Sequence, residues 1–197
     1  MHFNDKQGFT LLELAVVVAI VGVLSALGVS GLQKAVMNDR ARSAADELAS
    51  IFNQAASIAK QRSDSLCFMP PVSANNLVLR VYNTEDGVCD GDTIRVFPLD
   101  GLTVETPPRL DKLKSLLEID AEYGPARDWA NSASGNEALF VPRIGLNPIA
   151  TQGFIGVKVN ESRHAAVGKG AFSNYFQAYV CYNCDDDWGG PWWISHR

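Results

Sequence analysis

Histidine is scarce in this chain, with single residues at His2, His164 and His196. The sequence also lacks the His-Glu-x-x-His pattern of zinc proteases, the Gly-x-Ser-x-Gly pattern of serine hydrolases and a phosphate-binding glycine loop. Any catalytic centre would have to be assembled from scattered residues. We therefore predict that the protein is not an enzyme and uses no cofactor.

An excess of positive charge is also absent. Residues 34–197 hold 16 basic and 20 acidic side chains, whereas affinity for nucleic acid depends on neutralising phosphates. The sequence thus argues against DNA binding, with one alternative: Arg163, His164 and Lys169 could form a local basic patch.

Ionisable side chains are missing from Phe9 to Leu32, with the single exception of Glu13. A helix of these 24 residues would reach about 36 Å, enough to cross a bilayer core of about 30 Å. A carboxylate at the centre of such a helix costs at least about 2.5 kcal/mol, and less near an end, so it indicates a function and a partner. The alternative is a glutamate at the membrane interface. A cleaved secretory signal fits poorly, because the run is long and an acidic residue interrupts its start.

The stretch from Gly8 to Gly22, Gly-Phe-Thr-Leu-Leu-Glu-Leu-Ala-Val-Val-Val-Ala-Ile-Val-Gly, resembles the class III signal of type IV pilins and type II secretion pseudopilins. The resemblance implies that prepilin peptidase removes a leader, residues 1–8, by cutting between Gly8 and Phe9, and then N-methylates Phe9. It also implies that Glu13 guides assembly by meeting the amine of a neighbouring subunit's first residue. The implied partners are other pilin or pseudopilin subunits, prepilin peptidase, the inner-membrane assembly platform and, before assembly, the lipid bilayer.

The run departs from the pilin pattern in one respect, because pilins often carry a proline near the position of Ser30. A kink there would have to come from Gly28 and Gly31. The flanking charges are nearly balanced, so they give no clear orientation. The resemblance alone implies a single-pass protein of the bacterial inner membrane, with its globular part in the periplasm before it enters a pilus or pseudopilus.

An amphipathic pattern continues beyond the apolar run. Apolar residues recur at three- and four-residue spacing: Ala41, Ala44, Ala45, Leu48, Ile51, Phe52, Ala55, Ile58 and Ala59. No strong breaker lies between Leu32 and Lys60, which predicts one helix from about Phe9 to about Arg62. The alanine-rich stripe suits packing against a sheet, and a coiled-coil seam is the alternative.

The remaining residues, 63–197, are enough for one core and alternate apolar with polar side chains in short segments. A strand is predicted to open at Leu66, and further strands are predicted at 76–82, 93–97, 101–105, 138–141, 154–159 and 175–182. The strands at 76–82, 93–97 and 101–105 are expected to be successive and antiparallel, followed by a short helix near 110–118 and a loop-like stretch at 123–136.

These elements predict an α+β, pilin-like fold. It consists of the leader 1–8, a transmembrane assembly helix 9–33, its amphipathic continuation 34–62 and a mostly antiparallel β domain 63–197. The helix end, Ser57 to Arg62, and the strand opening at Leu66-Cys67 are similar to the H-type minor pseudopilins and related minor type IV pilins. This similarity implies a minor structural subunit that supports secretion or pilus biogenesis. A major subunit stays open, and a filament-displayed binding module, for adhesion or DNA uptake, is the alternative function.

Only four cysteines are present, and in a globular part outside the inner membrane they predict disulfides. Among three possible connectivities we favour Cys67 with Cys89, which bracket a hairpin-sized segment, and Cys181 with Cys184, which are close in sequence. A redox Cys-x-x-Cys motif would need a helix N-terminus, whereas this one ends a predicted strand. A four-cysteine zinc site would need two close pairs.

The C-terminal region carries two further clusters. The run Asp185-Asp186-Asp187 offers oxygen ligands for calcium, but three consecutive aspartates favour a solvated acidic turn. Trp188, Trp192 and Trp193 either cap the sheet as core residues or form an exposed patch for a neighbouring subunit or a sugar polymer. The sequence leaves both alternatives open.

Overall fold

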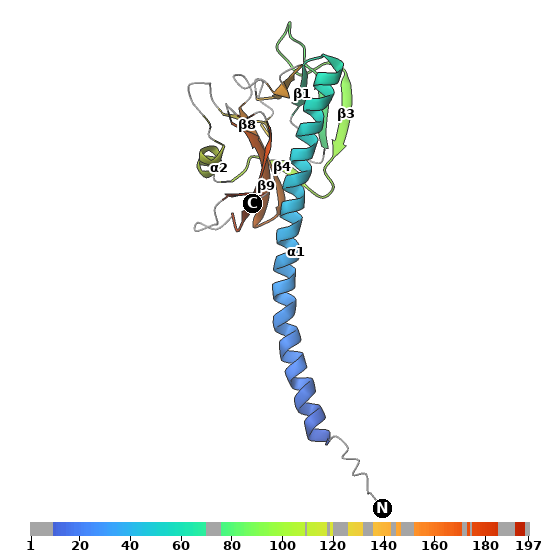
Figure 1. Cartoon of the computed structure of the whole chain (residues 1–197), viewed down its shortest axis with the longest axis vertical. Coiled ribbons are helices and arrows are strands. Elements are labelled where there is room, and N and C mark those ends of the chain that lie inside the picture. The colour runs from blue at the N-terminus through green and yellow to red at the C-terminus, as the bar shows by residue number, and fades with distance from the viewer. Residues whose placement is uncertain are drawn as a thin grey trace, which may run out of the picture. The chain divides into compact units, whose positions relative to one another are not determined.

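A computed structural model describes residues 10–69, 76–108, 110–117, 119, 126–131, 136–142, 145–146, 152–170, 173, 175–184 and 192–195 (Figure 1). The chain divides into two compact units, Met1–Met37 and Asn38–Arg197. We call the second the globular unit. Helix α1, Leu11–Arg62, contributes to both units.

The predicted long helix is confirmed as α1, which continues without interruption through Gly28 and Gly31. It ends where Ser63 adopts a left-handed backbone conformation, with φ of 57°, as is common just past a helix C-terminus. Most of the alanine-rich stripe of the second half is buried, and Leu48, Phe52 and Ala55 are fully so. Among the described residues, this stripe packs against strands of two sheets and against no second helix, in agreement with the sheet-packing prediction.

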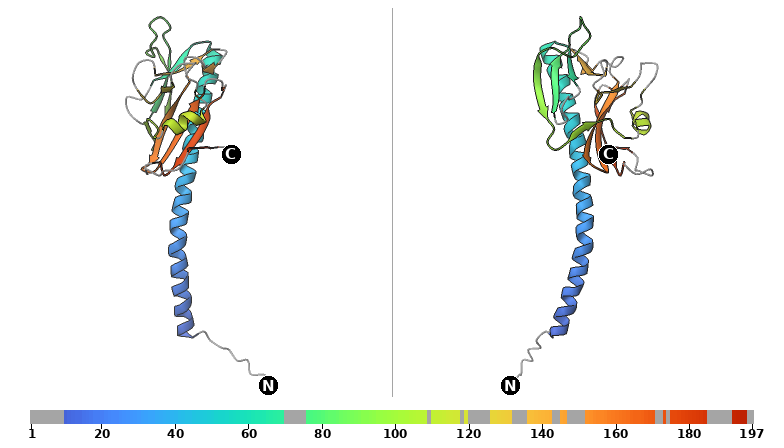
Figure 2. Two further views of the ribbon diagram at one scale, coloured as in Figure 1. Left: turned by 90° about the vertical axis from the view of Figure 1, so that its left-hand side faces the viewer. Right: turned by 180° about the vertical axis from the view of Figure 1, so that it is seen from behind.

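Two sheets accompany α1 in the globular unit (Figure 2). The first has the order β3-β2-β1-β6-β7 and antiparallel pairing throughout. Its strands are β1 Leu66–Met69, β2 Asn76–Val81, β3 Thr93–Pro98, β6 Ala138–Val141 and β7 Gly145–Leu146.

The second sheet has the order β11-β10-β9-β8-β4, also antiparallel, with the short β5 added parallel to β8. Its strands are β4 Thr103–Glu105, β5 Arg127–Asp128, β8 Gly153–Asn160, β9 Arg163–Lys169, β10 Gln177–Tyr182 and β11 Trp192–Ile194. One face packs on α1, and the other carries a smaller cluster beneath α2, Leu110–Leu116. The α+β, pilin-like architecture is thus confirmed.

The expected run of three successive antiparallel strands is wrong at its third member. β4 pairs with β8 in the second sheet and not with β3. The chain changes sheets at Gly101, whose φ of 71° is readily available only to glycine. Leu99 and Leu102 on either side are both buried, so these two side chains anchor the turn to the core, while Gly101 itself is exposed.

The stretch 123–136, expected to be loop-like, contains strand β5 and the buried Trp129. Trp129 lies directly against Gly153 at the start of β8, where an added Cβ would come within 2.7 Å of the indole nitrogen. A glycine at this position therefore allows the tryptophan to enter the core.

Candidate assembly site

The first described residues form a hydrogen-bonded pair at the start of α1. The Glu13 amide donates to Thr10 Oγ1 at 3.2 Å, and the Thr10 amide donates to Glu13 Oε2 at 2.9 Å. This reciprocal arrangement is a capping box, which satisfies amides that the first turn of a helix otherwise leaves without partners. Within one subunit, Glu13 is therefore the acceptor that closes the helix N-terminus.

The role of Thr10 is the one functional contribution at this site that our sequence reasoning missed. The signal was present, because Thr10-Leu11-Leu12-Glu13 has the Thr-x-x-Glu spacing of a capping box. Gly8 and Phe9, which flank the expected cleavage point, lie outside the described residues. Their expected roles stay predictions.

All described side chains from Leu11 to Val36 are exposed. They include Leu12, which is 75% exposed, and Leu24, which is 63% exposed. Exposure of so long an apolar surface to water is strongly unfavourable. Within the described residues, α1 is the one helix long and apolar enough to cross a membrane. The exposed surface is thus one that lipid or other apolar helices must cover.

The cysteine pairs in the structure are those favoured from the sequence. Cys67 and Cys89 are bonded with their Cα atoms 6.0 Å apart, and Cys181 and Cys184 with theirs 5.8 Å apart. In the second pair, Cys181 lies on β10 and Cys184 two residues beyond its end, so Cys181 is part of a strand and not of the helix N-terminus that would lower the pKa of a redox thiol.

The structure contradicts the alternative of a local basic patch formed by Arg163, His164 and Lys169. The Arg163 Nε donates to Asn38 Oδ1 at 2.8 Å, and His164 Nδ1 lies 2.7 Å from Glu105 Oε1 with its side chain buried. Lys169 is only 2% exposed. β9 lies in the middle of the second sheet and both of its faces are covered. Its alternating side chains therefore do not form an exposed basic face.

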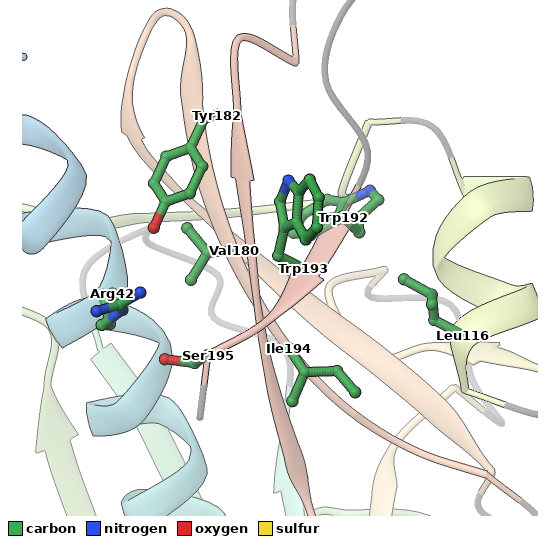
Figure 3. A pocket seen from close by; sticks show the side chains of 8 residues that line it. All are labelled: Arg42, Leu116, Val180, Tyr182, Trp192, Trp193, Ile194 and Ser195. Atoms are coloured by element: carbon green, nitrogen blue, oxygen red, sulfur yellow. The ribbon is translucent and has the colours of Figure 1, made fainter. Parts of the chain in front are cut away.

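The tryptophans of the C-terminal region have different environments. Trp192 is buried and its Nε1 donates to the Pro108 carbonyl at 3.1 Å, whereas Trp193, its neighbour on β11, is 57% exposed. Trp193 borders a groove together with Arg42 and Tyr182 (Figure 3). Both alternatives, core and surface, are therefore realised by adjacent residues, while Trp188 lies outside the described residues.

The possible calcium ligands Asp185, Asp186 and Asp187 also lie outside the described residues. Among the residues that are described, no group of three or more His, Cys, Asp or Glu side chains could hold a metal ion.

Comparison with known proteins gives one match. A family model described as the prokaryotic N-terminal methylation motif matches residues 3–29. No curated protein and no solved structure matches the chain. The matched region contains the expected cleavage point, the capping box and most of the exposed apolar surface of α1. Residues 3–29 of the chain therefore carry the class III prepilin signal found in type IV pilins and pseudopilins.

Proposed function

We propose that the protein is a structural subunit of a type IV pilus or type II secretion pseudopilus, held in the inner membrane by the first half of α1 before assembly. One observation carries this proposal: the N-terminal methylation motif overlaps a helix whose described apolar side chains from Leu11 to Val36 are exposed. Lipid can cover that surface first, and the helices of neighbouring subunits can cover it afterwards. The globular unit then lies in the periplasm, an oxidising compartment in which its disulfides are stable.

Glu13 has the capacity for an intermolecular role in addition to capping. The described hydrogen bonds from Thr10 reach only Oε2. A carboxylate has two acceptor oxygens, so Oε1 can accept the amine of a neighbouring subunit's Phe9. In an apolar surrounding the two charges attract strongly, although desolvation offsets much of the gain. The contact therefore favours correct register more than raw stability.

Within this class we propose a minor subunit, on the similarity of the helix end and first strand to minor pseudopilins and minor pilins. Its copy number relative to other subunits in sheared filaments tests this point. A filament-displayed adhesion module is the second candidate, favoured by the exposed Trp193. DNA uptake is not proposed, because the residues expected to form a basic patch are engaged or buried.

Replacement of Gly8 tests processing. A side chain at the residue before the cut is expected to block prepilin peptidase, so Gly8→Leu should accumulate in the membrane with its leader attached. Intact mass and N-terminal sequencing of the extracted protein measure this. Asn4→Leu, in the leader but away from the cut, serves as control and should be cleaved. Normal cleavage of the Gly8 variant would overturn the processing claim.

Replacement of Glu13 separates charge from capping. Glu13→Gln keeps an acceptor for the Thr10 amide but loses the negative charge, so we expect it to be cleaved normally yet to fall more than about tenfold in the filament fraction, which corresponds to about 1.4 kcal/mol. Thr10→Ala retains the charge and should assemble. Quantitative immunoblotting of sheared filaments against membranes compares them. Assembly of Glu13→Gln at the normal level would show that capping alone matters.

A further inference from the structure

A groove of about 520 Å³ lies beside β11, the edge strand of the second sheet. Arg42 of α1 borders one side and Leu116 of α2 the other, with Trp193 and Tyr182 contributed by adjacent strands (Figure 3). Its floor is held in place by the core, because Val180 is buried and Ser195 Oγ donates to Asp46 Oδ1 at 2.7 Å. The groove is therefore a formed surface.

Exposed apolar side chains and an arginine without a described ion-pair partner lie together along the groove. Outside α1, the exposed large apolar side chains of the described chain are Val96, Leu116, Tyr175 and Trp193, and two of these four line the groove. Arg42 is exposed and makes no hydrogen bond or ion pair with the described residues. Tryptophan and arginine are the residue types most enriched where binding energy concentrates at protein interfaces.

A second surface of the same unit has the complementary charge. The segment Asn83–Asp92, here called the acidic turn, carries Glu85, Asp86, Asp90 and Asp92 and no basic residue. All four acidic side chains are exposed. None of them forms an ion pair within the part of the chain that the structure describes.

The acidic turn is also held in one conformation. Cys89 ties it to β1 through the disulfide to Cys67. Asn83 Oδ1 accepts from the Glu85 amide at 3.0 Å, and Asn83 pairs with Val88 in an isolated β-bridge. A preformed loop loses little conformational entropy on binding, so the turn is suited to act as a rigid ligand.

The groove and the acidic turn lie at opposite ends of the globular unit. The turn begins beyond the C-terminal end of α1, where the Tyr82 amide donates to the Ser65 carbonyl at 2.8 Å. Arg42 precedes Arg62 by 20 residues of α1, or about 30 Å along the helix. The turn forms the protruding green loop in Figure 1, at the far end from the C-terminal strand. A copy of the chain therefore cannot insert its own turn into its own groove.

We propose that the groove receives the acidic turn of a second copy of this chain, with Arg42 facing its carboxylates and Trp193 buried in the contact. The inference rests on the proposed function as a filament subunit and requires that copies of this chain be neighbours in the filament, so a minor subunit present only as isolated copies would not form this contact. A contact between opposite ends of identical units is head-to-tail, and such contacts build open helical assemblies. A sugar polymer could also stack on Trp193, but it would leave both Arg42 and the acidic turn without charged partners.

Photo-crosslinking in cells that express the full chain tests the contact. With Trp193→benzoylphenylalanine, irradiation of filaments should give an adduct of twice the subunit mass, and peptide mapping should place the second attachment within residues 81–95. Tyr175→benzoylphenylalanine is the matched control, since Tyr175 is 58% exposed but does not border the groove. Attachment to a different protein or to a glycan, or the same adduct from position 175, would overturn the proposal.

A charge exchange provides the second arm. Arg42→Glu should reduce the adduct about fivefold or more, as loss of an interfacial ion pair of about 1 kcal/mol would. Adding Glu85→Lys and Asp90→Lys should restore it. Arg40→Glu changes the same charge on an exposed residue outside the groove and should have no effect. Absence of restoration in the combined variant contradicts the pairing.

Leader cleavage and filament content are measured in the same samples. A wild-type chain that is neither cleaved nor incorporated contradicts the proposed function itself. A chain that is cleaved and incorporated, but gives no adduct with the acidic turn, overturns the inference alone.

Discussion

Phe52→Ala is expected to destabilise the globular unit by about 4 kcal/mol, the usual scale for removing a fully buried phenylalanine. Phe52 is 0% exposed and lies at the centre of an aromatic cluster. Its ring centroid lies 4.9 Å from Phe68, 5.0 Å from Phe176 and 5.4 Å from Trp129. Phe68 lies on β1 of the first sheet, Phe176 just before β10 of the second sheet and Trp129 just after β5, so the three rings cannot close the cavity together.

Denaturant unfolding of the detergent-solubilised full chain, followed by tryptophan fluorescence, measures this change. Gln54→Ala, on the exposed side of the same helix, serves as the control and should shift stability by less than about 0.5 kcal/mol. Phe52→Leu should keep more than half of the stability that Phe52→Ala loses, since leucine refills much of the volume of the phenylalanine. A loss below about 1 kcal/mol for Phe52→Ala would show that α1 does not organise the core.

Lys169→Met is expected to stabilise the globular unit by about 2 kcal/mol at pH 7. Burial lowers the pKa of the Lys169 ammonium from 10.5 to about 8. A shift of this size corresponds to a penalty of about 3 kcal/mol on the charged form. The Lys169 ammonium has one described partner, the Gly170 carbonyl at 3.3 Å. Lys169→Met removes this hydrogen bond, which costs about 1 kcal/mol and leaves the net gain of about 2 kcal/mol.

The pH dependence distinguishes this cause from a packing effect. Between about pH 8 and 10.5 the unfolded chain holds a proton on Lys169 that the folded chain has released, so wild-type stability gains from this group as pH rises through that window. Below pH 8 the full penalty applies. The advantage of Lys169→Met over wild type should therefore shrink as pH rises, when unfolding is compared at pH 7 and pH 10. An advantage that does not change with pH would refute the assignment, and Lys112→Met at an exposed site should give none.

Periodic patterns made much of the fold predictable. The long helix was evident because no breaker interrupts three- and four-residue spacing over its length, and β6 was predicted at its observed bounds because its alternation matches burial on one face. β9 was not predicted from the sequence, because it lacks this alternation. It is buried on both faces between β8 and β10, so small residues such as Ala165 and Ala166 replace the alternation that marks a half-exposed strand.

Long-range pairing was the part that local patterns could not supply. The transfer of β4 to the second sheet depends on the turn at Gly101 and on β8, which lies about 50 residues further along the chain. At the assembly site, the family motif indicated Glu13 but not its capping partner Thr10. The groove beside β11 joins Arg42 to Trp193 across most of the sequence, and no spacing rule links such residues.

The placement of the two disulfides has a mechanical consequence. Cys67–Cys89 ties the acidic turn to the first sheet, and Cys181–Cys184 closes a loop at the end of β10 in the second; neither joins α1 to a strand. Tension applied along α1 therefore loads the helix–sheet packing in shear, supported by hydrogen bonds such as Asn38 to Arg163 and Asp46 to Ser195. The force needed to strip the helix from its sheets is set by that noncovalent contact, whatever the oxidation state of the cysteines.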